Sequence, residues 1–443
     1  RYDDCKVGVT AVYTNTNYAG AYRGFGNTEV CSGIEQAIDE LADKLNIDPM
    51  DFRLKNCLKV GDTTPHGHYL TESVGLTDCL LKVREMSNWD QKRKQFANQP
   101  ADAEKRRGIG VAALFHGTSL GAEGLDEATA TIEIHTDDKI TLTSGLTDYG
   151  TGARTVFTLI AAEILGVNPE RIEVLNPDTN TAKDSGPTVA SRTTILAGNS
   201  VRVAAQNLQQ NLDFAAADLL KCDPYQIHRI DGDYIGPSEE PVSWETVVKH
   251  AREMGLVLSA YGRWTAPEIH WDEEKGTGIP YFAYHFGAQV AEVEVDLKTG
   301  HTDVVDLWAV HDIGKVIFPQ GAYGQLYGGI SHGLGYGLYE DLDYQEGYPQ
   351  NINFDTYLIP TAMDMPEIKG DFVEAQFSEG PFGAKNIAEP AMVPTAPAIL
   401  NAIANATGRR VRDLPANLER VMLGKKLVKK GSPISCKVAL KKL

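Results

Sequence analysis

The sequence has 443 residues, long enough for two or three compact domains, and its 42% hydrophobic and 23% charged residues are typical of a globular protein. The formal net charge of −18 argues against a nucleic-acid partner or a membrane-surface role, because binding phosphates requires excess cations. No apolar run reaches the roughly 18 residues of a membrane helix, and the first residues lack the apolar core of a secretory signal.

The N-terminal quarter begins with an alternating, Val- and Thr-rich stretch, 2–13, which predicts extended chain. A tight Gly/Asn-rich segment, 15–26, follows it. An amphipathic helix is expected next, ending near Asp48-Pro49. Its apolar side chains share one face at helical spacing: Val30, Ile34, Ala37, Ile38, Leu41 and Leu45. The polar, charge-rich stretch 88–107 is expected to be a linker between domains.

Two similar hairpins are predicted further along the chain, over 130–144 and 289–310, from period-2 alternation around turn residues. A glycine-rich turn and a helical run follow each hairpin, at 154–165 and 322–338 respectively. The repeated unit suggests two related halves that face each other, with a ligand between them. The sequence therefore predicts a mixed α/β (α+β) fold and not a doubly wound dinucleotide fold.

The last predicted helix, about 395–407, stops at Gly408, a residue favoured just after a helix end. The basic tail 424–443 is expected to be solvated, with a contact to an acidic partner subunit as the alternative. The six cysteines form no Cys-x-x-Cys pair, which indicates reduced thiols in the cytoplasm. His66 and His68 lack a nearby carboxylate or thiol cluster, so we expect no metal held by protein side chains.

Four segments carry residue types suited to binding or catalysis, and each also has a plainer structural interpretation. The first, 21–26, reads AYRGFG; its glycines allow a sharp turn that presents Phe25, although such turns are usually only structural. The second, 149–155, reads YGTGART between a strand and a helix. Free amides at that helix start would bind an anion, but the full dinucleotide fingerprint is missing.

The third segment, 185–194, reads SGPTVASRTT and offers amides, hydroxyls and one cation to an oxyanion or phosphate; the alternative is a helix-capping loop. The fourth, 380–390, reads GPFGAKNIAEP. Glu389 is its lone carboxylate in an apolar, Gly/Pro-framed loop, and burial there would raise its pKa toward that of a general base. A loop glutamate is more commonly solvated.

The order of these four segments, and above all GAKNIAEP-x-x-V-P-T-A-P-A-I-x-N-A-I at the end, resembles the molybdenum hydroxylases, which include xanthine dehydrogenases, aldehyde oxidoreductases and nicotinate dehydrogenase. The resemblance runs from about Tyr13 to Leu423. It implies that the chain is the C-terminal half of the molybdopterin-binding subunit. Residues 1–87 would then complete a first molybdopterin-binding domain, 88–107 would be the linker, 108–423 a second such domain, and 424–443 the tail.

The resemblance also implies roles for individual residues. Glu389 would be the catalytic base, and Phe25 and Leu120 would contact a planar substrate from two sides. Leucine at the second position departs from the pair of phenylalanines in xanthine enzymes, which puts a purine pocket in doubt. The cofactor contacts would come from Tyr22, Arg23, Gly150, Thr151, Gly152, Ala190, Ser191, Arg192, Thr193 and Gln325. Thr151 stands where the family usually has glutamine.

The cofactor implied is molybdenum–molybdopterin, with the cytosine dinucleotide form as one option, and no protein side chain would ligate the metal. The family's first cofactor-binding half and its iron–sulfur and FAD modules are not in this sequence, so the resemblance implies partner chains for them. The expected reaction is hydroxylation, with water, of an electron-poor carbon in a purine- or nicotinate-like N-heterocycle. An aldehyde oxidoreductase and a non-catalytic scaffold subunit are the alternatives.

Overall fold

The computed structural model describes residues 5–100, 102–230 and 232–423. Its helices are α1 (Asn27–Leu45), α2 (Pro49–Asn56), α3 (Leu76–Met86), α4 (Trp89–Ala97), α5 (Ala153–Leu165), α6 (Thr193–Leu220), α7 (Trp244–Glu253), α8 (Pro319–Leu334), α9 (Thr395–Thr407) and α10 (Leu418–Leu423). Its longer strands are β1 (Lys105–Thr118), β2 (Glu127–Ile134), β3 (Ile140–Ser144), β8 (Ser259–Thr265), β11 (Ala283–Asp296), β12 (Thr302–Asp312) and β15 (Glu367–Val373). The short strands are β4 (Ile172–Val174), β5 (His228–Ile230), β6 (Asp233–Ile235), β7 (Pro241–Val242), β9 (Trp271–Asp272), β10 (Thr277–Gly278), β13 (Tyr344–Gln345) and β14 (Tyr348–Pro349).

The larger sheet has the strand order β1-β11-β12-β15, with β15 parallel to β12 and the other pairs antiparallel. Successive side chains of β1 and β11 point alternately to the two faces of this sheet. Helices cover both faces. One face packs on α2, α3 and α4 through residues such as Leu80 and Trp89. The other face packs on α9, which lies close to β1 because a Cβ at Gly110 would come within 2.1 Å of the Ala402 backbone.

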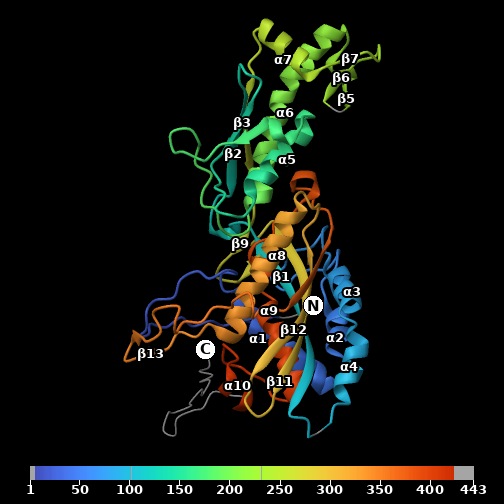
Figure 1. Cartoon of the computed structure of the whole chain (residues 1–443). Helices are drawn as coiled ribbons and strands as arrows, with labels where there is room; N and C mark the ends of the chain where they lie inside the picture. Colours follow the sequence, from blue (N-terminus) through green and yellow to red (C-terminus); the bar gives the residue numbers. More distant parts are fainter. Residues whose placement is uncertain (1–4, 101, 231, 424–443) are drawn as a thin grey trace.

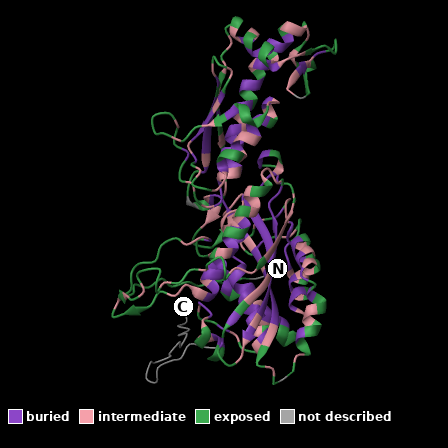
Figure 2. Ribbon diagram, in the orientation of Figure 1, coloured by how far each residue is buried: buried purple, intermediate pink, exposed green. Residues whose placement is uncertain are grey.

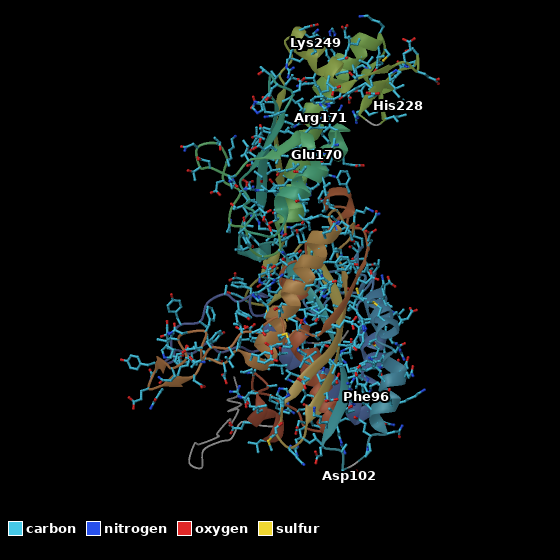
Figure 3. All side chains as sticks on the ribbon, viewed as in Figure 1. Phe96, Asp102, Glu170, Arg171, His228 and Lys249 are labelled. Carbon is cyan, nitrogen blue, oxygen red and sulfur yellow. The ribbon has the colours of Figure 1, made fainter. Side chains whose placement is uncertain are left out.

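The second sheet, β4-β3-β2-β8, is covered by the long helix α6, with α5 and α7 packed against α6. Gly262 of β8 allows this helix to approach, since a Cβ there would come within 2.1 Å of the Ser200 carbonyl oxygen. The two sheets lie toward opposite ends of an elongated molecule (Figure 1). Lys249 and His228 mark the far end of the α6 half, and Phe96 and Asp102 mark the opposite end (Figure 3).

Both predicted hairpins are confirmed, as β2–β3 and β11–β12. The predicted helices after them form as α5 and α8, and α9 ends at Gly408 in the left-handed conformation. The mixed α/β fold class is likewise confirmed. The predicted extended segment forms no strand over 5–14, and residues 2–4 and the tail 424–443 lie outside the described residues.

The expected linker, 88–107, contains α4 and the start of β1. Trp89 and Phe96 of α4 are buried in the same cluster as Met50 and Leu80, so this stretch forms part of a core and is not an exposed connection. Where one cofactor-binding domain ends and the next begins stays a prediction.

Helix α1 is at the predicted place, but its apolar face is turned outward. Ile34 and Leu45 are 52% and 59% exposed, while Glu35 and Asp39 on the opposite face are buried against Arg53 of α2, at 2.8 and 2.7 Å. The segment 5–21 and the arm 341–366, which lie side by side, are also largely exposed (Figure 2). In the described residues, no helix is long and apolar enough to cross a membrane.

Candidate functional site

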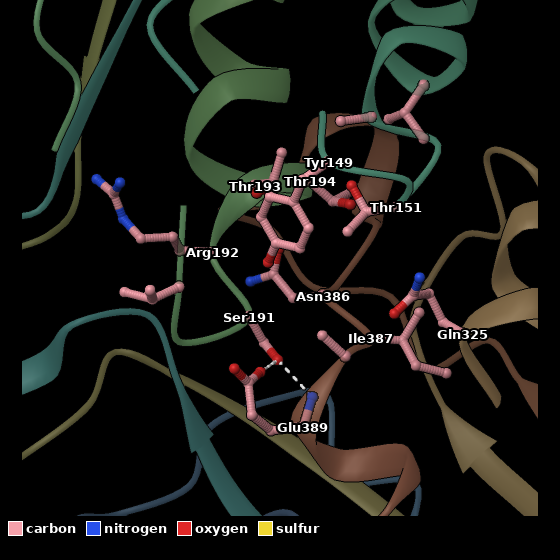
Figure 4. A pocket seen from close by; sticks show the side chains of 14 residues that line it. Tyr149, Thr151, Ser191, Arg192, Thr193, Thr194, Gln325, Asn386, Ile387 and Glu389 are labelled. Atoms are coloured by element: carbon pink, nitrogen blue, oxygen red, sulfur yellow. Dashed lines mark hydrogen bonds between the residues drawn. The ribbon is translucent and has the colours of Figure 1, made fainter. Parts of the chain in front are cut away.

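The candidate site lies where the two halves meet, around the loop 385–391 that carries Glu389 (Figure 4). Residues from both halves line a small pocket of about 70 Å³ there. Its lining comes from the first turn of α5 and the loop before it, the start of α6 and the loop before it, α8, and the Glu389 loop: Tyr149, Thr151, Ala153, Val156, Val189, Ser191, Arg192, Thr193, Thr194, Gln325, Asn386, Ile387, Ala388 and Glu389. A pocket therefore lies between the two halves, where the repeated hairpin units predicted a ligand.

Ser191 holds Glu389 at two points. Its hydroxyl donates to the Glu389 carboxylate and accepts the Glu389 backbone N–H at 3.0 Å. Ser191 and the preceding Ala190 both adopt left-handed backbone conformations, with φ of 45° and 57°. Such conformations are strained for residues other than glycine and are found mainly where the surrounding structure enforces them, often at functional sites.

Arg23 ties two of the four predicted segments, 21–26 and 380–390, to each other and to α8. Its guanidinium donates to the Ala388 carbonyl oxygen at 2.7 Å and to the Gln325 side-chain oxygen at 3.1 Å. Burial raises the pKa of Glu389 above its ordinary value, and backbone hydrogen bonds and the nearby Arg23 charge lower it only in part. A carboxyl whose pKa is raised in this way suits a general base.

A larger cavity of about 520 Å³ adjoins the small pocket, and Tyr149, Val189 and Glu389 line both. The predicted substrate residues Phe25 and Leu120 both line this cavity. Its full lining is Ala21, Tyr22, Arg23, Gly24, Phe25, Asn27, Phe115, His116, Gly117, Ser119, Leu120, Tyr149, Val189, Ala190, Tyr281 and Glu389. Five of these are aromatic, and only Arg23 and Glu389 carry a full charge.

His116 is neutral in this cavity, because burial lowers its pKa to about 4. Its Nδ1 lies 2.9 Å from Asn27 Nδ2, which can only donate, so the ring proton is assigned to Nε2. The cavity therefore presents a neutral imidazole beside its aromatic walls.

Arg192 does not have the side-chain role expected for it. Its guanidinium is 1% exposed and turns away from the pocket, where it pairs with Asp126 at 2.7 Å (Figure 4). Its remaining donors go to backbone carbonyls of Glu127, Ser185 and Pro187, at 2.8 to 2.9 Å. The Arg192 guanidinium therefore stabilises the loop before α6 through buried contacts, and it is not available to bind an anion.

The Gly150-Thr151-Gly152 turn likewise offers no free amides. The Asp148 carboxylate accepts the backbone N–H groups of Gly150, Thr151, Gly152 and Arg154, at 2.8 to 3.3 Å. The anion site expected here is already filled by the chain's own carboxylate. Burial raises the pKa of Asp148, but these four donors outweigh it and lower the pKa overall. Of the turn, Thr151 lines the small pocket, whereas Gly150 and Gly152 line neither pocket.

The other predicted site residues are brought together. Thr193 and Gln325 line the small pocket, and Tyr22 lines the cavity and donates to Glu340 at 3.3 Å. Tyr149, His116 and Tyr281 also line these spaces, although sequence patterns did not predict them as site residues. Tyr149 adjoins the glycine-rich turn and could have been found from that position. Tyr281 reaches the cavity only through tertiary packing, against Gly117 and Gly121, which no local pattern reveals.

Comparison with known proteins identifies the family. Residues 82–366 and 1–57 each match a family model described as a molybdopterin cofactor-binding domain. The chain is 31% identical over 418 residues to the xanthine dehydrogenase molybdenum-binding subunit of Escherichia coli O157:H7, covering 92% of this chain and 54% of that protein. It is 32% identical over 415 residues to the aldehyde oxidoreductase of Megalodesulfovibrio gigas, covering 93% and 42%.

Solved structures show the same likeness. The aldehyde oxidoreductase from Desulfovibrio gigas matches with a TM-score of 0.78 and 29% identity, covering 91% of this chain and 41% of that one. Quinoline 2-oxidoreductase from Pseudomonas putida 86 matches with a TM-score of 0.79 and 26% identity, covering 91% and 53%. The chain thus spans about half the length of these relatives. It belongs to the molybdenum hydroxylase family of xanthine dehydrogenase and aldehyde oxidoreductase, as part of the molybdopterin-binding region.

Proposed function

We propose that this chain belongs to the catalytic subunit of an enzyme that hydroxylates an electron-poor carbon of a flat N-heterocycle with water, with Glu389 as the general base. One observation carries the proposal: Glu389 lines both the small pocket and the larger cavity. A base between a cofactor and a substrate must reach both. Its raised pKa supports the same role.

The polar groups that line the small pocket suit contacts to a molybdopterin group, of which a space of about 70 Å³ can hold only a part. Within the described part of the chain, Asn386 Nδ2 beside this pocket and Ser119 Oγ beside the cavity are buried without a hydrogen-bond partner. Buried polar atoms normally have partners, so orphaned ones beside a pocket support a missing ligand. Gln325, Thr151, Thr193 and the backbone around Ser191 would hold the group.

When bound, that group supplies the two-electron redox chemistry of a hydroxylation in which water provides the oxygen. The residues of this chain supply position and a proton acceptor. Ser191 fixes the Glu389 carboxylate from one side, and Arg23 fixes the backbone just before it. Glu389 then accepts a proton at its carboxylate. Because burial favours its neutral form, the proton is held more firmly than by an exposed glutamate.

The substrate class follows from the cavity walls. Phe25, Phe115, Tyr149 and Tyr281 offer ring faces and edges to a planar molecule, and the cavity volume of about 520 Å³ suits one or two fused rings. Leu120 leaves one side of the Phe25 ring without an aromatic partner. An aldehyde is the second candidate, favoured by the 32% identity to an aldehyde oxidoreductase. Two relatives named for nicotine-type compounds support the heterocycle.

The partner is inferred from the outward apolar face of α1, formed by Val30, Ile34, Leu41 and Leu45. A helix normally buries such a face. Relatives carry about as much sequence again outside the matched region. We therefore infer that the remaining half of the molybdopterin-binding region packs on this face. Iron–sulfur and FAD subunits would accept the electrons released by the reaction.

The location that we propose is the cytoplasm. The free thiols of Cys31, Cys57 and Cys79 support it, because cytoplasmic proteins keep their cysteines reduced.

The experiment is metal and substrate analysis of the complex purified through a tag on this chain. We expect one molybdenum and one pterin per heteromer and faster turnover of purine- or nicotinate-like heterocycles than of aromatic aldehydes of the same size. Molybdenum without heterocycle turnover, but with aldehyde turnover, would move the assignment to the second candidate. A complex that contains no molybdenum would instead support the scaffold alternative and overturn the proposal.

A further inference from the structure

Two histidines that line neither pocket are buried side by side beneath the Glu389 loop. His285 of β11 and His311 of β12 are both 0% exposed, and their ring centroids are 5.1 Å apart. His285, Gly287 and Gln289 share one face of β11, since side chains alternate along a strand. Gly287 lies opposite His311 in the ladder, and a Cβ there would come within 2.5 Å of His311 Nδ1. Glycine at this position therefore makes room for the imidazole.

The hydrogen bonds of this group run in a single direction. Thr395 donates to Gln289 Oε1 at 2.7 Å, and Gln289 Nε2 donates to His311 Nε2 at 3.2 Å. His311 Nδ1 must then carry the proton that bonds His285 Nε2, at 2.9 Å. His285 Nδ1 in turn donates to the Asn386 carbonyl oxygen, at 3.0 Å. Each donor meets one acceptor when both rings are neutral, and these are the tautomers assigned here.

Both ends of this chain of hydrogen bonds are attached to the backbone that flanks Glu389. His285 reaches the carbonyl of Asn386, three residues before Glu389. Gln289 Nε2 also donates to the carbonyl of Ala391, two residues after Glu389, at 2.8 Å. A loop of six residues is therefore held on both sides of the carboxylate by side chains of a single strand, β11.

Two further contacts hold the same loop. Lys385, buried at its start, pairs with Asp312, the residue after His311, at 2.6 Å. The Asn386 side-chain oxygen accepts the backbone N–H of Ile195 at 3.0 Å, which ties the loop to the start of α6 and so to the Ser191 side of the site. Such a buried polar group is stable only when its members are satisfied, and it then has one geometry.

We propose that Gln289, His311 and His285 are positioning residues for Glu389: they fix the backbone on both sides of the base, so that its carboxylate lies between the small pocket and the cavity. This inference rests on the proposed function of Glu389. Reacting groups must be held within a fraction of an ångström, and a displacement of about 1 Å from a distant change can cost roughly 100-fold in rate.

The test compares Gln289→Leu with Gln209→Leu in the assembled complex, using the substrate that the parent oxidises. Gln209 is an equally buried glutamine of α6 that donates to Tyr234 at 3.1 Å, far from Glu389. For Gln289→Leu we expect kcat to fall by roughly 10- to 100-fold. KM and molybdenum content should stay near the parent values, and the acid limb of the kcat profile should shift. Gln209→Leu should lose similar stability and keep the parent's kcat and pH profile.

Thr395 provides a milder pair of variants if Gln289→Leu does not fold. Thr395→Val removes the donor to Gln289 and should lower kcat and move the same acid limb, whereas Thr395→Ser keeps the hydroxyl and should restore both. Parent-like kcat and pH profiles in Gln289→Leu or Thr395→Val would overturn the positioning role. Loss of turnover in Glu389→Gln alongside such results would leave the proposed base intact, whereas full turnover in Glu389→Gln would refute the base itself.

Discussion

At the scale of single residues, the site depends on strained backbone that sequence patterns do not indicate. Ala190 and Ser191 adopt consecutive left-handed conformations, each costing of the order of 1–3 kcal/mol. This turn brings the Ser191 hydroxyl to both the amide and the carboxylate of Glu389. The strain thus accompanies the Ser191 contacts that join the α6 half to Glu389.

Replacement of Glu389 by glutamine should not destabilise the protein at neutral pH. Burial raises the pKa of Glu389 above its ordinary value of 4.5, because the charged form is less favourable in the folded protein. The free energy of unfolding therefore falls as the pH rises through the folded-state pKa. Glutamine carries no such charge. We expect the Tm of Glu389→Gln at pH 7 to equal or exceed that of the parent, and the difference to shrink toward pH 4. A markedly lower Tm at pH 7 would indicate a structural role for the carboxylate.

The sequence predicted which segments form the site better than it predicted what each side chain does. Ser191, Arg23, Gln325 and Glu389 do converge. The side chain of Arg192, in contrast, serves Asp126, 66 residues earlier in the chain, and Asp148 occupies the amides of the glycine-rich turn. The order of the motifs predicts where the backbone of each segment lies. It does not predict the partner of a charged side chain, because that depends on tertiary contacts.

At the scale of elements, α1 likewise shows that a sequence pattern predicts an element but not its packing partner. Helical spacing correctly predicted the helix and its apolar stripe. The buried face is nevertheless the polar one, because Arg53 of α2 pairs with Glu35 and Asp39 inside the protein. By contrast, the hairpins β2–β3 and β11–β12 were predictable because their alternation and turns are local. Periodicity identifies an apolar face but not the surface against which it packs.

The outward face of α1 gives a prediction about assembly. The double variant Leu41→Glu and Leu45→Glu places two charges on this face, and burying an unpaired charge costs several kcal/mol. We expect it to weaken binding of the partner half by at least about 100-fold, since each 1.4 kcal/mol is tenfold. Because both leucines are about half exposed, the Tm of this chain alone should stay near the parent value. The measurement is the yield of intact complex on size-exclusion chromatography.

Gln91→Glu and Gln95→Glu make the matched control, since they add two glutamates at the same spacing to exposed positions of α4. Assembly of the control should be unchanged. If the α1 variant assembled as fully as the control, the partner would bind elsewhere. If it abolished only self-association of this chain, the occupant of the face would be a second copy.

At the scale of the whole molecule, the central feature is the Glu389 carboxylate at the junction of two sheet-and-helix halves. Within the part of the chain that the structure describes, the halves share no strand, and they meet at the pocket and cavity that Glu389 lines. Clefts between structural units are a common place for ligands. The repeated hairpin–turn–helix unit predicted this arrangement, although not the arm 341–366 or the neighbouring segment 5–21, whose exposed surfaces have no local sequence signature.

The most direct test of Glu389 as the base is turnover by the assembled complex carrying Glu389→Gln, with molybdenum content measured on the same sample. We expect kcat to fall by about 10²–10⁴-fold at unchanged molybdenum content, as for removal of a general base. Glu292→Gln, a buried carboxylate paired with Lys92 and Arg107 outside the site, should keep its turnover. Turnover near the parent rate in Glu389→Gln, with the cofactor in place, would contradict the assignment.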